Sequence, residues 1–266
     1  MPDASTPHLA AAATPPGSPA PVLLVTGASR GIGAACAVRA AQAGWDVAVN
    51  YHRDAPAAER VAAQVRAAGR RALVVQADVG RVQDIPALFA AVDAGLGRVS
   101  GLVNNAGVVD VAQRVDEMSA ERLQRMWAIN LTGSFLCARE ALQRMSTRHG
   151  GAGGAIVNLS SAAARLGSPG QYVDYAASKA AIDTFTLGLA REVAAEGVRV
   201  NGVRPGIIDT DIHASGGEPD RAARLAPQVP MRRAGSADEV AAAIVWLLSA
   251  EASYVTGTVM DVSGGR

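Results

Sequence analysis

The chain has 266 residues, a formal net charge of +1 and 49% hydrophobic residues, enough for one large core. Because no run of like charge appears, this balance argues against nucleic acid or a membrane surface as the main partner. Cys36 and Cys137 lie far apart in apolar helical patterns, which favours buried thiols and a cytoplasmic protein. No apolar run reaches the ~18 residues of a membrane span.

Residues 1–21 differ in composition from the rest of the chain. They hold six of the 13 prolines and an alanine run, with neither a basic flank nor a strong apolar segment. Such a stretch is typical of neither a signal peptide nor a helix. We expect a disordered leader at residues 1–21 and one domain over residues 22–266.

From Val22 onward, short apolar runs alternate with helical patterns. Parallel strands need helical crossovers, so this alternation predicts an α/β fold, a single doubly wound Rossmann-type domain with a seven-stranded parallel sheet. The strands are expected at residues 22–25, 47–49, 72–75, 101–103, 155–159, 199–203 and 258–261. The helices are expected at 33–43, 56–68, 82–95, 119–148, around 175–195 and from Ser236, where Glu239 completes a capping box.

The first predicted strand leads directly into a glycine-rich turn, Thr26-Gly27-Ala28-Ser29-Arg30-Gly31-Ile32-Gly33. Its glycines allow a tight turn that places the amides of a helix N-terminus against a pyrophosphate. A glycine turn alone is a weak signal, but the order of strand, turn and helix strengthens it. The turn therefore predicts a dinucleotide site.

Lys179 is the only lysine in the chain and follows Tyr175 by four residues. On a helix this spacing puts both side chains on one face, about 5–6 Å apart. A nearby positive charge favours the phenolate and brings the pKa of the tyrosine toward the working pH. On spacing alone, a surface lysine beside a tyrosine by accident is the alternative.

The chain contains the glycine-rich turn, Asn104-Asn105-Ala106-Gly107, Asn130, Ser161 and the Tyr175–Lys179 pair, in this order. The combination resembles the short-chain dehydrogenase/reductase family over about residues 22–265, in its glucose 1-dehydrogenase-like or 3-oxoacyl-carrier-protein reductase-like branch. The resemblance implies an oxidoreductase that interconverts an alcohol and a carbonyl on a small substrate by hydride transfer. The alternative is a non-catalytic dinucleotide-sensing or scaffold protein on the same fold.

The resemblance also implies a role for each catalytic residue, and no metal. Tyr175 would be the general acid/base, and Lys179 would lower its pKa and hold the nicotinamide ribose. Ser161 would hydrogen-bond the reacting oxygen, and Asn130 would anchor a water that links Lys179 to solvent. Ser160 remains open as the alternative to Ser161, because adjacent strand residues point to opposite faces.

The residues at the end of the second predicted strand indicate the cofactor preference. NAD-specific sheets place an acid there, whereas this chain has no carboxylate before Asp54. Arg30, with His52 or Arg53, would instead pair with a 2′-phosphate, so NADP(H) is preferred and NAD(H) is possible. Exposed loop arginines are the alternative. The expected cofactor contacts are Gly27, Ser29, Arg30, Gly31, Ile32, Gly33, Asn50, His52, Arg53, Asp78, Val79, Asn105, Ala106, Gly107, Tyr175, Lys179, Pro205, Gly206, Ile208 and Thr210.

Two further expectations concern the substrate and assembly. Residues 208–233 mix glycine, proline and charges with helical pieces, which favours a substrate lid, although a solvated surface would have the same pattern. The helices over about 119–148 and 175–195 carry more apolar residues, including Met126, Phe135 and Ile182, than one sheet face covers. In the resembled family such helices pair in tetramers, so we expect a homotetramer. The substrate itself is left open between a sugar, a 3-oxoacyl thioester and another carbonyl.

Overall fold

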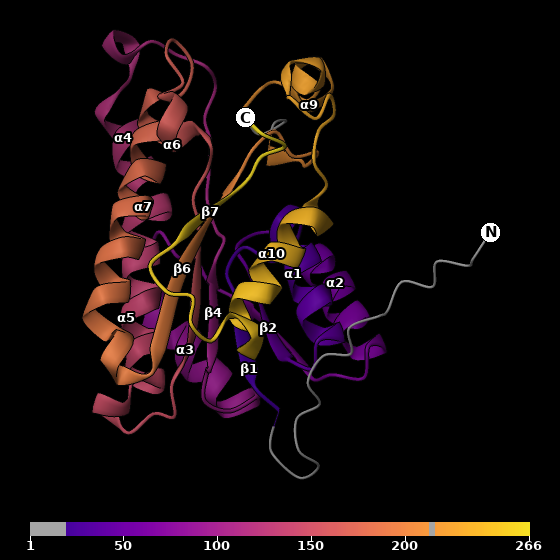
Figure 1. The fold of residues 1–266 in the computed structure, drawn as a ribbon, viewed down its shortest axis with the longest axis vertical. Helices are drawn as coiled ribbons and strands as arrows, with labels where there is room; N and C mark the ends of the chain where they lie inside the picture. The colour runs from indigo at the N-terminus through magenta and orange to yellow at the C-terminus, as the bar shows by residue number, and fades with distance from the viewer. Residues whose placement is uncertain (1–19, 213–215) are drawn as a thin grey trace, which may run out of the picture.

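The computed structural model describes residues 20–212 and 216–266 (Figure 1), so almost all of the expected leader lies outside the described residues. The described chain forms a seven-stranded, all-parallel sheet in the order β3-β2-β1-β4-β5-β6-β7, which confirms the predicted fold. The strands are β1 (Val22–Val25), β2 (Asp46–Tyr51), β3 (Ala72–Gln76), β4 (Gly101–Asn104), β5 (Gly154–Leu159), β6 (Val198–Pro205) and β7 (Val259–Val262).

Helices cover both faces of the sheet. In Figure 1, α5 and α7 lie on one side of the strands, and α1, α2 and α10 lie on the other. None of the helices within the described residues is long and apolar enough to cross a membrane. The α-helices are α1 (Gly31–Gln42), α2 (Ala55–Ala67), α3 (Asp84–Gly95), α4 (Ala120–Trp127), α5 (Gly133–Met145), α6 (Ala163–Leu166), α7 (Val173–Val193), α9 (Arg221–Leu225) and α10 (Ala237–Leu248).

The core consists of two apolar layers, one on each face of the sheet. Buried side chains of α1, α2 and α10 pack on one face, and α3, α5 and α7 supply the second layer. Cys36 and Cys137 are buried free thiols in these layers, and burial raises the pKa of each to about 12. The predicted cap of the last helix is present, because the Glu239 amide donates to Ser236 Oγ at 3.1 Å.

The long helix expected over residues 119–148 is interrupted. Between α4 and α5 the chain forms a π-helical turn, η2 (Ala128–Thr132), and Asn130 at its centre is buried. The sequence pattern did not reveal this turn, because it is a single wider turn within an otherwise helical segment.

The strand order places the predicted motifs together. From β1 the sheet is built outward through β2 and β3, and from β4 it is built in the opposite direction, so β1 and β4 flank a topological switch point. Ligands of open parallel sheets bind outside the carboxyl ends of the strands at this point. The glycine turn follows β1, Asn105 follows β4 and Ser161 follows β5, so all three lie at this edge.

Candidate active site

The turn after β1 depends on its glycines. Gly27 and Gly31 have φ values of +62° and +57°, in the left-handed region that favours glycine. At Gly33 a Cβ atom would lie 2.4 Å from Asn105 Nδ2 and 2.7 Å from the Gly27 carbonyl oxygen, so no side chain fits. In this described segment no side chain caps the N-terminus of α1, and its first turn holds no acid. The turn therefore fits an anionic pyrophosphate.

Three polar side chains hold this turn in place. Thr26 Oγ1 accepts from the amides of Asn105 and Ala106, both at 3.0 Å, and Asn105 Nδ2 donates to the Gly27 carbonyl at 3.0 Å. Asn50 Oδ1 accepts from the Gly27 amide at 3.1 Å. Asn50 is 2% exposed, so its side chain supports the turn, and its expected contact with the cofactor stays a prediction. The sequence motifs did not predict this supporting role of Thr26, although a hydroxyl directly before the first glycine could have indicated it.

Helix α7 carries Tyr175 and Lys179 to the carboxyl end of β5. Lys179 is 4% exposed, its Nζ donates to the Leu159 carbonyl at 2.6 Å, and Nζ lies 5.7 Å from the centre of the Tyr175 ring. The accidental surface lysine is thereby excluded. Ser160 is also buried, and its hydroxyl donates to the Lys179 carbonyl at 3.0 Å, whereas the Ser161 side chain interacts with the Tyr175 phenol and lowers its pKa. Of the two serines, Ser161 is the one placed beside Tyr175.

The protonation of this pair differs from the sequence expectation. We expected the Lys179 ammonium to lower the pKa of Tyr175, but burial raises the pKa of the phenol, and hydrogen bonding with Ser161 only partly opposes this. Burial also lowers the pKa of Lys179 to about 8, against the charge of Asp183, which favours the ammonium. Both side chains lie in a low-dielectric site, so the loss of hydration disfavours the charged form of each.

Asn130 lies in η2 with both ends of its amide engaged. Its Oδ1 accepts from the Val108 amide at 2.8 Å, and its Nδ2 donates to the Val108 carbonyl at 2.9 Å and to Ser178 Oγ at 3.2 Å. A Cβ at Gly107 would lie 3.4 Å from Lys179 Nζ and 3.5 Å from Asn130 Oδ1. Asn130 thus fixes the segment after β4 close to Lys179.

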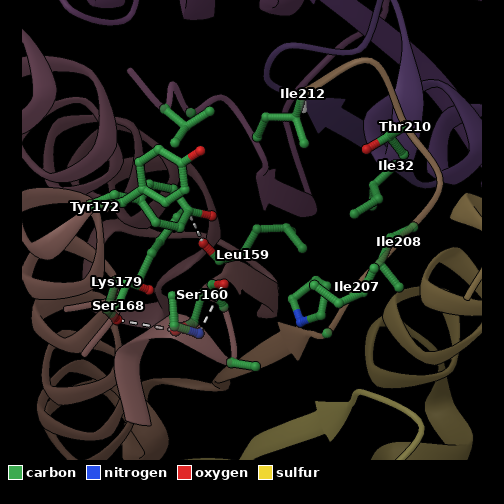
Figure 2. A pocket seen from close by; sticks show the side chains of 18 of the residues that line it. Ile32, Leu159, Ser160, Ser168, Tyr172, Lys179, Ile207, Ile208, Thr210 and Ile212 are labelled. Atoms are coloured by element: carbon green, nitrogen blue, oxygen red, sulfur yellow. Dashed lines mark hydrogen bonds between the residues drawn. The ribbon is translucent and has the colours of Figure 1, made fainter. Parts of the chain in front are cut away.

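A cavity opens beside these residues. Figure 2 shows Tyr172 and Lys179 on one side of it and Ile32, Ile208 and Thr210 on the opposite side. The segment after β6 closes against the glycine turn, because the Thr210 methyl lies 3.5 Å from a Cβ built at Gly31. The lining residues include Ile32, Asn105, Gly107, Ser161, Tyr172, Tyr175, Lys179, Pro205, Gly206, Ile208 and Thr210.

The far end of the predicted cofactor site is exposed. Arg30, His52 and Arg53 are all accessible, as a 2′-phosphate partner must be. His52 Nε2 lies 3.6 Å from Asp78 Oδ2, and Asp78 Oδ1 accepts from the Gly80 amide at 2.9 Å. Val79 is buried in the core, so only its backbone is placed to contact a ligand.

A charge pair stabilises part of the expected lid. In the described part of residues 208–233, α9 carries Arg221, whose Nη1 donates to Glu218 Oε1 at 2.9 Å. The Tyr172 hydroxyl donates to the same oxygen at 2.8 Å, which joins the lid to the start of α7. Among the described residues no cluster of His, Cys, Asp and Glu has the arrangement of a metal site.

A buried ion pair next to Tyr175 was also missed from the sequence. Arg122 of α4 donates through Nε and Nη2 to the two oxygens of Asp174, at 2.8 and 3.2 Å. Its Nη1 donates to the Val111 carbonyl at 2.8 Å. The pair therefore joins α4, the segment after β4 and the first turn of α7. Asp174 precedes Tyr175 directly, but the sequence does not indicate its partner, which lies 52 residues away.

The glycine turn and the Tyr175–Lys179 pair on one parallel sheet define a Rossmann-type oxidoreductase. A family model described as Enoyl-(Acyl carrier protein) reductase matches residues 27–266. The chain is 55% identical to "Uncharacterized oxidoreductase YgfF" of Escherichia coli (strain K12), over 92% of this chain and 99% of that protein. It is 37% identical to "Glucose 1-dehydrogenase 2" of Bacillus subtilis (strain 168), over 91% and 93%.

A solved structure agrees with these relatives. A short chain dehydrogenase from Burkholderia cenocepacia J2315 in complex with NADP superposes with a TM-score of 0.83 at 33% identity, over 91% of this chain and 96% of that chain. The chain belongs to the short-chain dehydrogenase/reductase family, as the sequence motifs predicted. It is an NAD(P)-dependent enzyme of the oxidoreductase class that acts on CH-OH groups.

Proposed function

We propose that the protein is an NADP(H)-dependent reductase or dehydrogenase that interconverts a carbonyl and an alcohol on a small substrate, with Tyr175 as general acid/base. The observation that carries this proposal is the convergence of Ser161, Tyr175 and Lys179 on one cavity. That cavity opens at the edge of the sheet where the glycine turn lies. The relatives are named oxidoreductases, and nothing in them favours the non-catalytic alternative.

A bound NADP(H) supplies or accepts the hydride. The Ser161 hydroxyl is placed to donate a hydrogen bond to the substrate oxygen, on which negative charge develops during reduction. Tyr175 gives its proton to the same oxygen, or takes it back in oxidation. Lys179 in its ammonium form stabilises the phenolate that results and would hold the nicotinamide ribose. Asn130 orders the segment beside Lys179. It would also anchor the water through which protons return to Lys179.

Activity should depend on pH through Lys179. Burial lowers its pKa to about 8, so the ammonium predominates below that pH and is lost as pH rises through it. If the ammonium is the active form, kcat/KM for carbonyl reduction at saturating NADPH should fall on the alkaline side of about pH 8. Asp183→Asn should move this limb to lower pH, because the Asp183 carboxylate raises the pKa of Lys179. A profile that is flat from pH 7 to 9, or unmoved in Asp183→Asn, would exclude this role.

Cofactor preference should depend on Arg30. The guanidinium is exposed at the end of the glycine turn, where a 2′-phosphate but not a 2′-hydroxyl can pair with it. We expect wild type to bind NADPH more tightly than NADH, and Arg30→Ala to weaken NADPH by about 10-fold or more with little change for NADH. Dissociation constants from protein fluorescence quenching measure both.

Arg60→Ala is the matched control, because Arg60 is an exposed arginine of the neighbouring α2. It should leave both dissociation constants unchanged. Equal losses for the two cofactors in Arg30→Ala would assign Arg30 to the shared pyrophosphate or to structure. A wild-type preference for NADH would reject the NADP(H) assignment.

The expected homotetramer and cytoplasmic location remain part of the proposal. Met126 and Ile182, named for the interface, are each only 1% exposed and are covered by their own chain, so that part of the expectation is wrong. The exposed apolar residues of α4 and α5 are Trp127 at 44% and Phe135 at 46%, and Phe135 stacks on Phe185 of α7 at 3.7 Å. These side chains are the better candidates for contact between subunits.

A further inference from the structure

One arginine in the described chain differs from the others in its environment. Arg266 is partly buried, and its Nη1 atom is buried without a hydrogen-bond partner among the described residues. Arg70 also has a buried nitrogen without a partner, Nε, but Arg70 and every other buried or partly buried arginine there donate to at least one acceptor. These arginines are Arg39, Arg70, Arg122, Arg144, Arg199, Arg204 and Arg221.

The backbone that carries Arg266 is anchored. The Arg266 amide donates to the Ser263 carbonyl at 3.3 Å, and Ser263 Oγ donates to the Arg266 carbonyl at 2.9 Å. The same segment pairs with the chain after β6, because the Gly206 amide donates to the Val262 carbonyl at 3.0 Å. Arg266 is therefore held beside the segment that follows β6.

Arg266 lines the same cavity as Ser161 and Tyr175. No aspartate or glutamate side chain is among the described lining residues, which include two other basic groups. Lys179 donates to the Leu159 carbonyl, and Arg221 is paired with Glu218. The guanidinium of Arg266 is thus the basic lining group without an acceptor among the described residues. An unpaired charge in a partly buried site is costly, so a partner anion on the ligand would stabilise it.

The cofactor's own phosphates do not account for this group. A pyrophosphate is expected at the N-terminus of α1 after β1, and a 2′-phosphate at Arg30. Arg266 follows β7, which lies at the opposite edge of the sheet from β3, with β5 and β6 between β7 and the β1–β4 switch point. An anion bound by Arg266 would therefore be carried by the substrate.

We infer that Arg266 is a specificity-determining residue that binds a carboxylate on the substrate, at the end of the molecule away from the reacting carbonyl. This inference rests on the proposed carbonyl–alcohol activity. A guanidinium forms two parallel hydrogen bonds with a carboxylate. The apolar side chains of the cavity suit a hydrocarbon linker between that carboxylate and the reacting carbonyl. Those side chains are Leu166, Tyr172, Ile207, Ile208 and Ile212.

The test compares acids with neutral esters that have the same reacting carbonyl. The probes are 4-oxopentanoate, 5-oxohexanoate and 6-oxoheptanoate with their methyl esters, reduced by the full chain with saturating NADPH. We expect wild type to favour at least one acid over its ester. Arg266→Gln should lower kcat/KM for that acid by about 10- to 100-fold, mainly through KM, and leave the ester within about 2-fold. Arg266→Lys should recover part of the loss, and Arg60→Gln should lose nothing.

A second measurement tests carboxylate binding by Arg266 independently of the proposed carbonyl–alcohol activity. Binding of pentanoate, hexanoate and heptanoate to the protein–NADP⁺ complex is measured by calorimetry for wild type and Arg266→Gln, with the melting temperature of each. Carboxylate binding that is lost in Arg266→Gln supports the inference even if no ketone is reduced, a result that would count against the proposed reaction alone. The inference is overturned if no acid is preferred and no carboxylate binds, or if acid and ester lose equally. Weaker NADPH binding in Arg266→Gln would assign Arg266 to the cofactor and would overturn it as well.

Discussion

Lys179→Arg should lower kcat/KM by on the order of 10²-fold or more, the scale of losing a positioned acid–base group. Nζ donates to the Leu159 carbonyl at 2.6 Å and lies 3.4 Å from the position of a Cβ at Gly107. A planar guanidinium on a longer side chain does not fit this narrow space, although it keeps the charge. At an exposed position without a role in the site, a Lys→Arg change would alter the free energy of unfolding by only about 0.5 kcal/mol or less.

Tyr175→Phe should lose at least as much activity while still binding cofactor, because it removes only the hydroxyl. The fold-loss of kcat/KM in the double variant should be far smaller than the product of the two single losses, since the effects of residues that act as one unit are non-additive. Tyr254→Phe is the matched control, because Tyr254 is fully exposed and should show wild-type activity. kcat/KM is measured for all five proteins on one accepted substrate. Near wild-type activity in either single variant would end the catalytic assignment.

Arg122→Met should lower the free energy of unfolding by about 3–5 kcal/mol, because it leaves the Asp174 carboxylate buried and unpaired. The two side chains are 6% and 0% exposed, and the hydrogen bonds with Asp174 raise the pKa of Arg122. Activity should fall with stability, since Arg122 also holds the Val111 carbonyl and Asp174 adjoins Tyr175. Replacing both residues, in Arg122→Met/Asp174→Leu, should recover most of the stability but not the activity.

The exposed pair Arg114–Asp116 provides the comparison for this ion pair. Its side chains are 73% and 68% exposed, so Arg114→Met should change the free energy of unfolding by about 1 kcal/mol or less. Urea unfolding of the four proteins measures these differences. If Arg122→Met costs no more than Arg114→Met, the ion pair does not contribute through its burial.

Local patterns in the sequence were enough to predict the architecture. Apolar runs alternating with helical periodicity predicted the seven parallel strands, because a buried parallel sheet requires both. Ser236 and Glu239 predicted a cap that spans one helical turn. The glycine turn and the Tyr175–Lys179 spacing were also readable, since backbone conformation and a helix face depend on residues near in sequence.

Other features were decided only by the tertiary structure, because they depend on burial and on residues far apart in the chain. Burial in the folded site raises the pKa of Tyr175, although the sequence spacing predicted the opposite direction. The choice between Ser160 and Ser161 depended on how β5 meets α7. Arg266 gave no signal in the sequence, because only the pairing of the segment after β7 with the chain after β6 brings it to the cavity.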